Sequence, residues 1–222
     1  MADPVKPARR PYESPRRRLQ AERTRRDILD AAQRLFEGQG YAATTMAAIA
    51  GEAGVALKTV YVAFETKAGV LRALWHLLLR GDQEDVPVAS RSWYREVLEE
   101  PDPERLLRGV AHYSRQVKER VGAILAVIRS AADADPDVGE LWRRIQSEFY
   151  DTMRPLVEAV EAHGGLAPGL DVTRATDILW TLNHPDLWHL LVGQRGWSAD
   201  EFEAWFADTL CAQLLLPATP PG

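Results

Sequence analysis

The stretch from Thr44 to Lys67, TTMAAIAGEAGVALKTVYVAFETK, holds two short helical patterns separated by a glycine turn. The first pattern is too short to be stable alone, because isolated helices below about 12 residues are marginal in water. It must therefore pack on neighbouring helices. Gly54 supplies the positive φ that a tight turn between helices requires, and the second helix is expected over residues 56–64. This order of elements is typical of a helix-turn-helix.

The second short helix is expected to present two different faces. Val60 and Phe64 are expected to point inward, and Val55, directly after the turn, is expected to join them in the core. The outward positions of the helix are Leu57, Lys58, Tyr61 and Val62. These side chains are free to contact a partner.

The helix before this unit has the strongest apolar periodicity in the chain. Its apolar positions follow the spacing i, i+3, i+4, i+7 and i+8 and are Ile28, Ala31, Ala32, Leu35 and Phe36. Gly38 and Gly40 are expected to end the helix, because glycine is common just after a helix C-terminus. One face of the long helix is therefore expected to pack on the two short helices.

Residues 24–74 resemble the tetracycline-repressor (TetR) family of bacterial regulators. The resemblance rests on the phased helix, the G-x-x-x-T-T start, the A-G-V turn, the T-x-Y-x-x-F segment and the T-K pair. It implies an all-α protein with an N-terminal three-helix DNA-binding domain, here residues 21–67. A helical ligand-binding and dimerisation domain is expected to follow over residues 68–216, with a tail at 217–222.

The resemblance also implies the roles of individual side chains on DNA. Thr45 is expected to cap the first short helix and to contact a phosphate, while Tyr61 and Lys67 contact two further phosphates. Such contacts set the register of the protein on the duplex without reading its sequence.

Base reading is expected to fall to the exposed face of the second short helix. The residues concerned are Leu57, Lys58, Thr59 and Val62. Only Lys58 and Thr59 can hydrogen-bond a base edge. Val62 and Ala63 stand where larger polar or aromatic residues are common in the family, so contact with thymine methyl groups is expected to contribute.

Each of these residues also has a purely structural interpretation. Thr45 favours a helix N-cap in any protein, Tyr61 can be half-buried packing, and Lys67 alone is an ordinary solvated lysine. Their joint order and spacing favour DNA binding. Two alternatives stay open: a ligand-binding protein or enzyme that keeps the helix-turn-helix only as scaffold, and an architectural DNA binder without an effector.

The charge is divided along the chain. Overall the protein is acidic, with 27 basic and 32 acidic residues, which argues against a nonspecific nucleic-acid coat. Residues 1–80 nevertheless carry a net charge of +6, and residues 81–222 carry −11. The basic part is the part expected to meet phosphate.

An arm at residues 1–20 carries much of the basic excess. Its prolines, Pro4, Pro7, Pro11 and Pro15, are expected to keep it from folding. Such an arm either follows a DNA groove or serves as a solubilising tail, and the sequence supports both interpretations equally.

Several function classes find no support in the sequence. It lacks a phosphate-binding glycine loop, a G-x-S-x-G elbow and a cysteine-based metal pattern, so we expect no enzymatic activity, cofactor or metal. His184 and His189 are five residues apart, one too many for two ligands on one helical turn. No apolar run approaches the roughly 20 residues that span a bilayer, and the single cysteine, Cys211, fits a reducing compartment. A cytoplasmic protein without membrane contact is expected.

The remainder of the chain is expected to be helical. A short helix is expected over residues 93–98, then one helix phased by residues 106–117 and another by residues 121–128. A further helix follows the break at Asp133 to Asp137 and continues to Gly164.

The last two helices, near residues 172–191 and 199–213, have unusually wide apolar surfaces. Pro185 is expected to interrupt the first of them. Ser198 and Glu201 form a capping box for the second, with Trp197 opposite Phe202 as a hydrophobic staple. In the TetR family the last two helices pair with those of a second subunit, and apolarity on two sides independently favours a homodimer.

A small-molecule effector is expected in the second domain. Aromatic walls with a few polar ends suit an apolar or aromatic ligand, although each aromatic residue is equally explained as core. The candidates are Tyr113, Trp142, Tyr150, Trp180, His184 and Trp188. The chain is thus expected to be a dimeric repressor that binds a palindromic operator and releases it when this ligand binds.

Overall fold

The computed structural model describes residues 15–80 and 91–215, which are helical and contain no β-strand. The expected all-α fold is confirmed. The helices, in chain order, are α1 (Pro15–Ala43), α2 (Met46–Glu52), α3 (Leu57–Phe64), α4 (Lys67–Arg80), α5 (Ser92–Leu98), α6 (Pro103–Ala131), α7 (Pro136–Ala162), α8 (Val172–Leu182), α9 (Pro185–Trp188), the π-helix η2 (His189–Gln194) and α10 (Ala199–Leu214).

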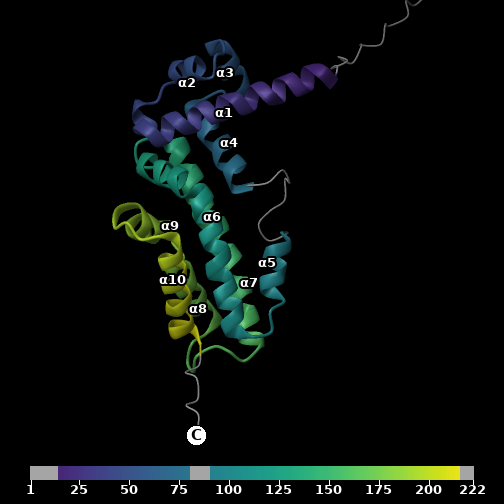
Figure 1. The fold of residues 1–222 in the computed structure, drawn as a ribbon, viewed down its shortest axis with the longest axis vertical. Coiled ribbons are helices and arrows are strands. Elements are labelled where there is room, and N and C mark those ends of the chain that lie inside the picture. Colours follow the sequence, from purple (N-terminus) through teal and green to yellow (C-terminus); the bar gives the residue numbers. More distant parts are fainter. Residues whose placement is uncertain (1–14, 81–90, 216–222) are drawn as a thin grey trace, which may run out of the picture.

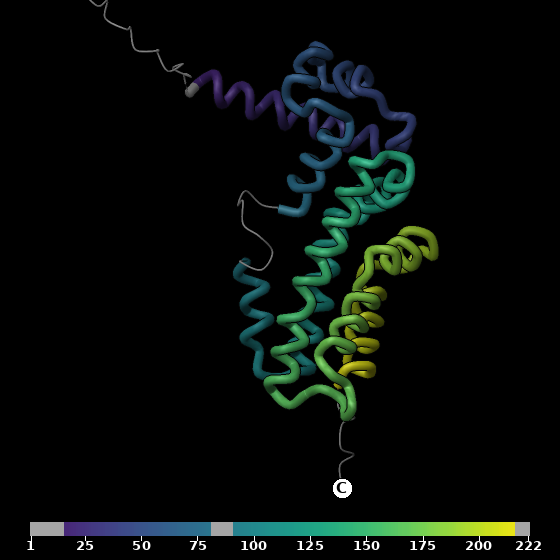
Figure 2. The backbone as a smooth tube through the Cα atoms, turned by 180° about the vertical axis from the view of Figure 1, so that it is seen from behind, coloured from purple at the N-terminus to yellow at the C-terminus, as the bar shows by residue number. Residues whose placement is uncertain are grey.

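The molecule is elongated, with α1 to α3 at one end (Figure 1). Helices α2 and α3 lie on one side of α1, and α4 descends from them toward the long helices α6 and α7. These two run along most of the second part of the chain, with α5 on one side and α8 and α10 on the other, as the view from behind also shows (Figure 2). Helix α4 therefore lies between helices α1 to α3 and the long helices.

One expectation about α1 is wrong, and a second is right for only one of its two glycines. The helix begins at Pro15, so residues 15–20 are helical and do not belong to an unfolded arm, while residues 1–14 lie outside the described residues. Proline is well tolerated in the first turn of a helix because its missing N–H has no intrahelical partner there. Of the two glycines expected to end the helix, Gly40 does leave helical geometry, with φ 80° and ψ 171°, so the helix is broken there, whereas Gly38 stays helical.

Helix α6 is a single helix of 29 residues rather than the two that were expected. The apolar positions on either side of Val117 stay in one helical register, so a single face is buried from Leu106 to Ile128. Asp102 caps the start by accepting hydrogen bonds from two backbone N–H groups. The break before α7 is as expected, with Asp135 as N-cap and Pro136 in the first turn.

The last described helices begin and end where their local sequence signals predict. Helix α8 stops at Asn183, Pro185 restarts the chain as α9, and the expected capping box of Ser198 and Glu201 is present. The expected staple of Trp197 on Phe202 stays a prediction. The Trp197 ring meets Trp205 edge to face at 6.0 Å, about one helical turn beyond Phe202.

The described residues form two apolar cores, and the boundary between them lies midway along the long helices α6 and α7. The first joins α1 to α4 with the C-terminal half of α6 and the N-terminal half of α7. The second joins α5, α8 and α10 with the other halves of α6 and α7. Helices α1 to α3 thus share a core with the part of the chain that follows them, and the boundary at residue 67 stays a prediction.

None of the described helices is by itself long and apolar enough to cross a membrane. Only α2 and α3 taken together pass on length and composition, and their axes are bent by 113°.

Candidate DNA-binding surface and ligand pocket

The turn between α2 and α3 has the geometry that its glycine predicts. Gly54 adopts φ 66°, and the N–H of Val55 donates to the carbonyl oxygen of Ala50. Thr45 caps α2, because its Oγ1 accepts a 3.0 Å hydrogen bond from the N–H of Ala48. Thr44 is fully buried beside it, so the threonine pair has one inward and one outward member.

Helix α3 separates its core face from its exposed face as expected. Val60 is fully buried and Phe64 is 6% exposed, whereas Tyr61 is 48% and Val62 is 76% exposed. Val55 is half-buried and packs against the first core. The candidate DNA contacts on α3 are placed as follows: Leu57 and Lys58 are exposed and Thr59 is half-buried. The individual roles of these side chains on DNA remain predictions.

Lys67 has structural partners that its sequence position did not indicate. Its Nζ donates to the carbonyl oxygens of Tyr41 at 2.8 Å and Thr44 at 3.0 Å, and it lies 4.1 Å from the centre of the Tyr41 ring. The lysine therefore holds the segment that leads into α2. An ammonium has three N–H donors, so one remains for a phosphate.

Arg25 makes structural contacts with α3 that the sequence analysis missed. Its Nη1 donates to the carbonyl oxygen of Ala63 at 2.8 Å, and its guanidinium lies 4.1 Å from the centre of the Phe64 ring. It thus satisfies a carbonyl at the C-terminal end of α3, where a positive charge is favourable. Only the fold brings these positions together, since 38 residues separate Arg25 from Ala63.

Tyr41 links helices α1 to α3 to the rest of the chain. Its hydroxyl donates a 2.6 Å hydrogen bond to Oδ2 of Asp135, the N-cap of α7, and its ring stacks on Phe36. This hydrogen bond is the main reason that the pKa of Asp135 lies below its ordinary value. Burial, reinforced by the same bond, raises the pKa of Tyr41, so the tyrosine stays a donor.

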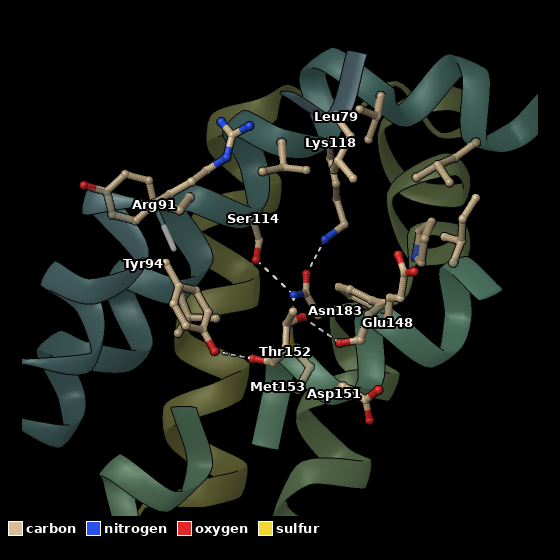
Figure 3. A pocket seen from close by; sticks show the side chains of 18 of the residues that line it. Leu79, Arg91, Tyr94, Ser114, Lys118, Glu148, Asp151, Thr152, Met153 and Asn183 are labelled. Carbon is tan, nitrogen blue, oxygen red and sulfur yellow. Dashed lines mark hydrogen bonds between the residues drawn. The ribbon is translucent and has the colours of Figure 1, made fainter. Parts of the chain in front are cut away.

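A cavity of about 630 Å³ lies between α4, α5, α6 and α7 (Figure 3). Its volume is in the range of roughly 300 to 1,000 Å³ found for ligand pockets. The aromatic residues of its wall are Trp75, Trp93, Tyr94, Tyr113 and Phe149. An apolar enclosure of this kind suits a small organic molecule.

The chain is similar to known bacterial regulators. The sequence pattern described as "Bacterial regulatory proteins, tetR family" matches residues 28–74. Over 166 residues the chain is 30% identical to the probable HTH-type transcriptional regulator ArpR of Pseudomonas putida, a match that covers 72% of this chain and 76% of that protein. The chain belongs to the TetR family.

Two further similarities agree with this assignment. The HTH-type transcriptional regulator AcrR of Shigella flexneri is 40% identical over 58 residues, which span 26% of this chain and only 27% of that regulator. The structure of NalD, the secondary repressor of the MexAB-OprM multidrug efflux pump in Pseudomonas aeruginosa, has a TM-score of 0.67 at 22% identity. It covers 89% of this chain and 98% of its own. The chain is accordingly a DNA-binding transcriptional regulator.

Only one of the six aromatic candidates lines the large cavity of this TetR-family regulator. Tyr113 is part of its wall, and Trp142 lines a separate cavity of about 240 Å³. Trp188 packs against Phe202 at 5.0 Å and fills the space over Gly122, so it belongs to the core.

The other three candidates do not line the large cavity, and their rings contact one another. Trp180 meets both Tyr150 and His184 edge to face, at 6.3 and 5.3 Å between ring centres. The Tyr150 hydroxyl donates to Asp177 on α8. Tyr150, Trp180, His184 and Trp188 thus lie outside the lining of the large cavity, and their role as ligand contacts stays a prediction. Aromatic character alone does not distinguish a cavity wall from a filled core.

The polar side chains of the cavity were also missed. Lys118 on α6 is 5% exposed and donates to Oδ1 of Asn183. The Asn183 amide nitrogen in turn donates to Ser114 Oγ at 2.9 Å (Figure 3). Burial lowers the pKa of Lys118 to about 7. The lysine and the asparagine are 65 residues apart, so no local pattern connects them.

Proposed function

We propose that this TetR-family regulator is a dimeric, non-enzymatic repressor in the cytoplasm that leaves its operator when a small molecule occupies the large cavity. One observation carries the proposal: the cavity borders α4, the helix that leads directly from the DNA-binding unit. Trp75, His76 and Leu79 of α4 line the cavity. Residue Lys67 at the start of the same helix holds the segment before α2.

The start of α4 lies so close to α3 that a shift of one helix must move the other. A Cβ atom at Gly69 would lie 2.1 Å from the carbonyl oxygen of Phe64. The Thr66 hydroxyl accepts a hydrogen bond from the N–H of Gly69 and completes this corner. A ligand that favours another position of α4 would therefore change the position of the recognition helix.

Release further requires a difference in ligand affinity between two states. A ligand shifts the equilibrium only if it binds better to the geometry in which the two recognition helices are wrongly spaced for successive major grooves. The Tyr41 to Asp135 hydrogen bond supports such a coupling, since it joins the segment before α2 to the first residues of α7. Ile145 and Phe149 of α7 line the same cavity.

Dimerisation through the last helices of the described chain, α8 to α10 with η2, is supported by the apolar side chains that these segments leave partly exposed. Leu190 is 45% exposed, and several neighbours are half-buried: Ile178, Leu182, Leu187, Leu191 and Trp205. A four-helix bundle with a second copy would cover them.

A mobility shift with the DNA upstream of the protein's own gene tests the proposal. We expect a complex that resists excess scrambled DNA of the same length and that dissociates when a ligand raising the melting temperature is added. Equal affinity for both fragments would indicate an architectural DNA binder. A ligand that binds without any specific DNA complex would indicate that the helix-turn-helix is only scaffold.

A further inference from the structure

We propose that the large cavity recognises molecules with an apolar or aromatic body and a carboxylate group, and that the carboxylate binds Lys118. This inference rests on the proposed function of the cavity as an effector site and specifies the chemistry of the effector.

Lys118 is held in position with donors to spare. Its Nζ donates to Asn183 Oδ1, and that amide is itself fixed by Ser114 Oγ at 2.9 Å and by the sulfur of Met153 at 3.6 Å. The rings of Phe202 and Phe206 lie 5.7 and 5.5 Å from Nζ. An ammonium carries three N–H groups, and Asn183 accepts only one of them. The amine therefore has a fixed place in the cavity wall and unused donors.

The surroundings of Lys118 supply no counter-charge. Among the described residues no carboxylate forms an ion pair with it, and desolvation is the cause of its lowered pKa. A charged lysine without a partner in an apolar site is costly, and the group responds by releasing its proton. A ligand carboxylate would restore the charged form, because an opposite charge nearby favours it.

The other charged groups in the cavity lining are more often basic than acidic. Its basic lining residues besides Lys118 are Arg80, Arg91 and Arg144, and its acidic ones are Glu148 and Asp151. Glu148 is already paired with Arg144 at 2.6 Å and is largely exposed, so it does not neutralise Lys118. The titratable histidines nearby are His76 in the cavity wall and His184 beside Lys118, and burial lowers the pKa of both. The lining thus holds four basic residues and two acidic ones.

Gln146 provides a second polar contact for a ligand. Both its amide nitrogen and its amide oxygen are buried, and neither has a hydrogen-bond partner among the described residues. Unsatisfied buried amides are rare because each costs desolvation free energy. Since Gln146 lines the cavity, a polar group of a bound molecule is a natural partner.

Matched pairs of probes test the proposal. Calorimetric titrations would compare biphenylacetate, naphthylacetate and decanoate with the corresponding primary amides, which keep the apolar body and remove the charge. We expect at least one carboxylate to bind the wild-type protein and its amide to bind roughly tenfold or more weakly. Lys118→Met should lose this preference. Arg154→Met, which removes an exposed charge paired with Glu158 outside the cavity lining, should keep it.

A second measurement does not depend on any variant. Near pH 8 Lys118 is largely neutral in the free protein, so carboxylate binding should take up close to one proton. Titrations in two buffers with different ionisation enthalpies measure this uptake. No binding by any carboxylate, equal binding of acid and amide, or binding without proton uptake would each overturn the inference. Carboxylate binding that depends on Lys118 but leaves the operator complex intact would support the inference and overturn the proposed release mechanism.

Discussion

The Tyr41 hydroxyl and the Asp135 carboxylate are 2.6 Å apart, although 94 residues separate them in the sequence. Asp135 also accepts hydrogen bonds from the N–H groups of Asp137 and Val138 and so starts α7. Tyr41 in turn offers its carbonyl oxygen and its ring to Lys67. One short chain of contacts therefore runs from the start of a cavity helix to the start of α4.

Tyr41→Phe tests whether this chain couples ligand binding to DNA binding. The ring and its stacking on Phe36 are kept, and only the hydrogen bond to Asp135 is lost. We expect the free energy of unfolding to fall by about 1 to 2 kcal/mol and the effect of a ligand on operator affinity to become smaller. Chemical denaturation and operator titrations with and without ligand measure the two quantities.

Tyr150→Phe is a matched control for this variant. It removes another tyrosine hydroxyl that donates to an aspartate, Asp177, but on the exposed surface between α7 and α8. It should leave the ligand effect on operator affinity unchanged. If both variants leave the effect unchanged, the Tyr41 to Asp135 bond is structural only.

Gly69→Ala should damage the corner between α3 and α4. The new methyl group would lie 2.1 Å from the carbonyl oxygen of Phe64, and a backbone atom cannot rotate away. We expect a loss of roughly 1 to 3 kcal/mol in the free energy of unfolding and weaker operator binding. Gly38→Ala is the control, because nothing lies within 4 Å of its Cβ position. It should stabilise α1 by up to about 1 kcal/mol. Thermal denaturation of both variants measures the change in stability, and operator titrations measure the change in affinity. A stable Gly69→Ala protein with normal operator affinity would contradict the proposed coupling between α4 and α3.

The helix-turn-helix was predictable because its signals are local. Gly54 at the turn and the spacing of Val60 and Phe64 determine the path of the chain within a few residues. The cavity was not predictable in this way, because Lys118 and Asn183 meet only after α6 and α8 have packed. Trp142 and Trp180 lie in helices, as do Trp75 and Trp93, but only the latter two line the large cavity.

Lys58→Ala and Tyr61→Phe should weaken DNA binding in different ways. Both side chains are exposed on α3. If Lys58 reads a base, its loss relaxes preference at one base pair by roughly 1 to 3 kcal/mol. If Tyr61 contacts a phosphate, Tyr61→Phe should weaken binding to all sequences alike. Affinity measurements on a set of single-base operator variants separate these patterns, and a uniform loss in Lys58→Ala would make Lys58 another phosphate contact.

Lys118→Met should change how stability depends on pH. The pKa of Lys118 is about 7 in the folded protein, below its ordinary value of 10.5, so the unfolded chain binds more protons between these pH values. The stability contributed by this group therefore rises with pH from about 7 to 10, by up to roughly 1.4 kcal/mol per unit. Lys118→Met lacks this rise, so its stability relative to wild type should fall as the pH increases. The free energy of unfolding of both proteins, measured by denaturation at several pH values, checks this. If it changes with pH by the same amount in both, the lysine is charged when buried.

Leu190→Glu tests the proposed dimer with little risk to the fold of the subunit. Leu190 is 45% exposed, so a glutamate is tolerated in a lone subunit but would be buried without a partner in an interface formed by α8, α10 and η2. We expect the variant to be monomeric and to lose operator binding, because a single half-site offers too few contacts. Leu19→Glu replaces a leucine that is 66% exposed near the start of α1 and should remain dimeric. Light scattering at micromolar concentration distinguishes the two outcomes. A wild-type monomer with intact operator binding would remove the dimer, and with it the release mechanism that depends on the spacing of two recognition helices.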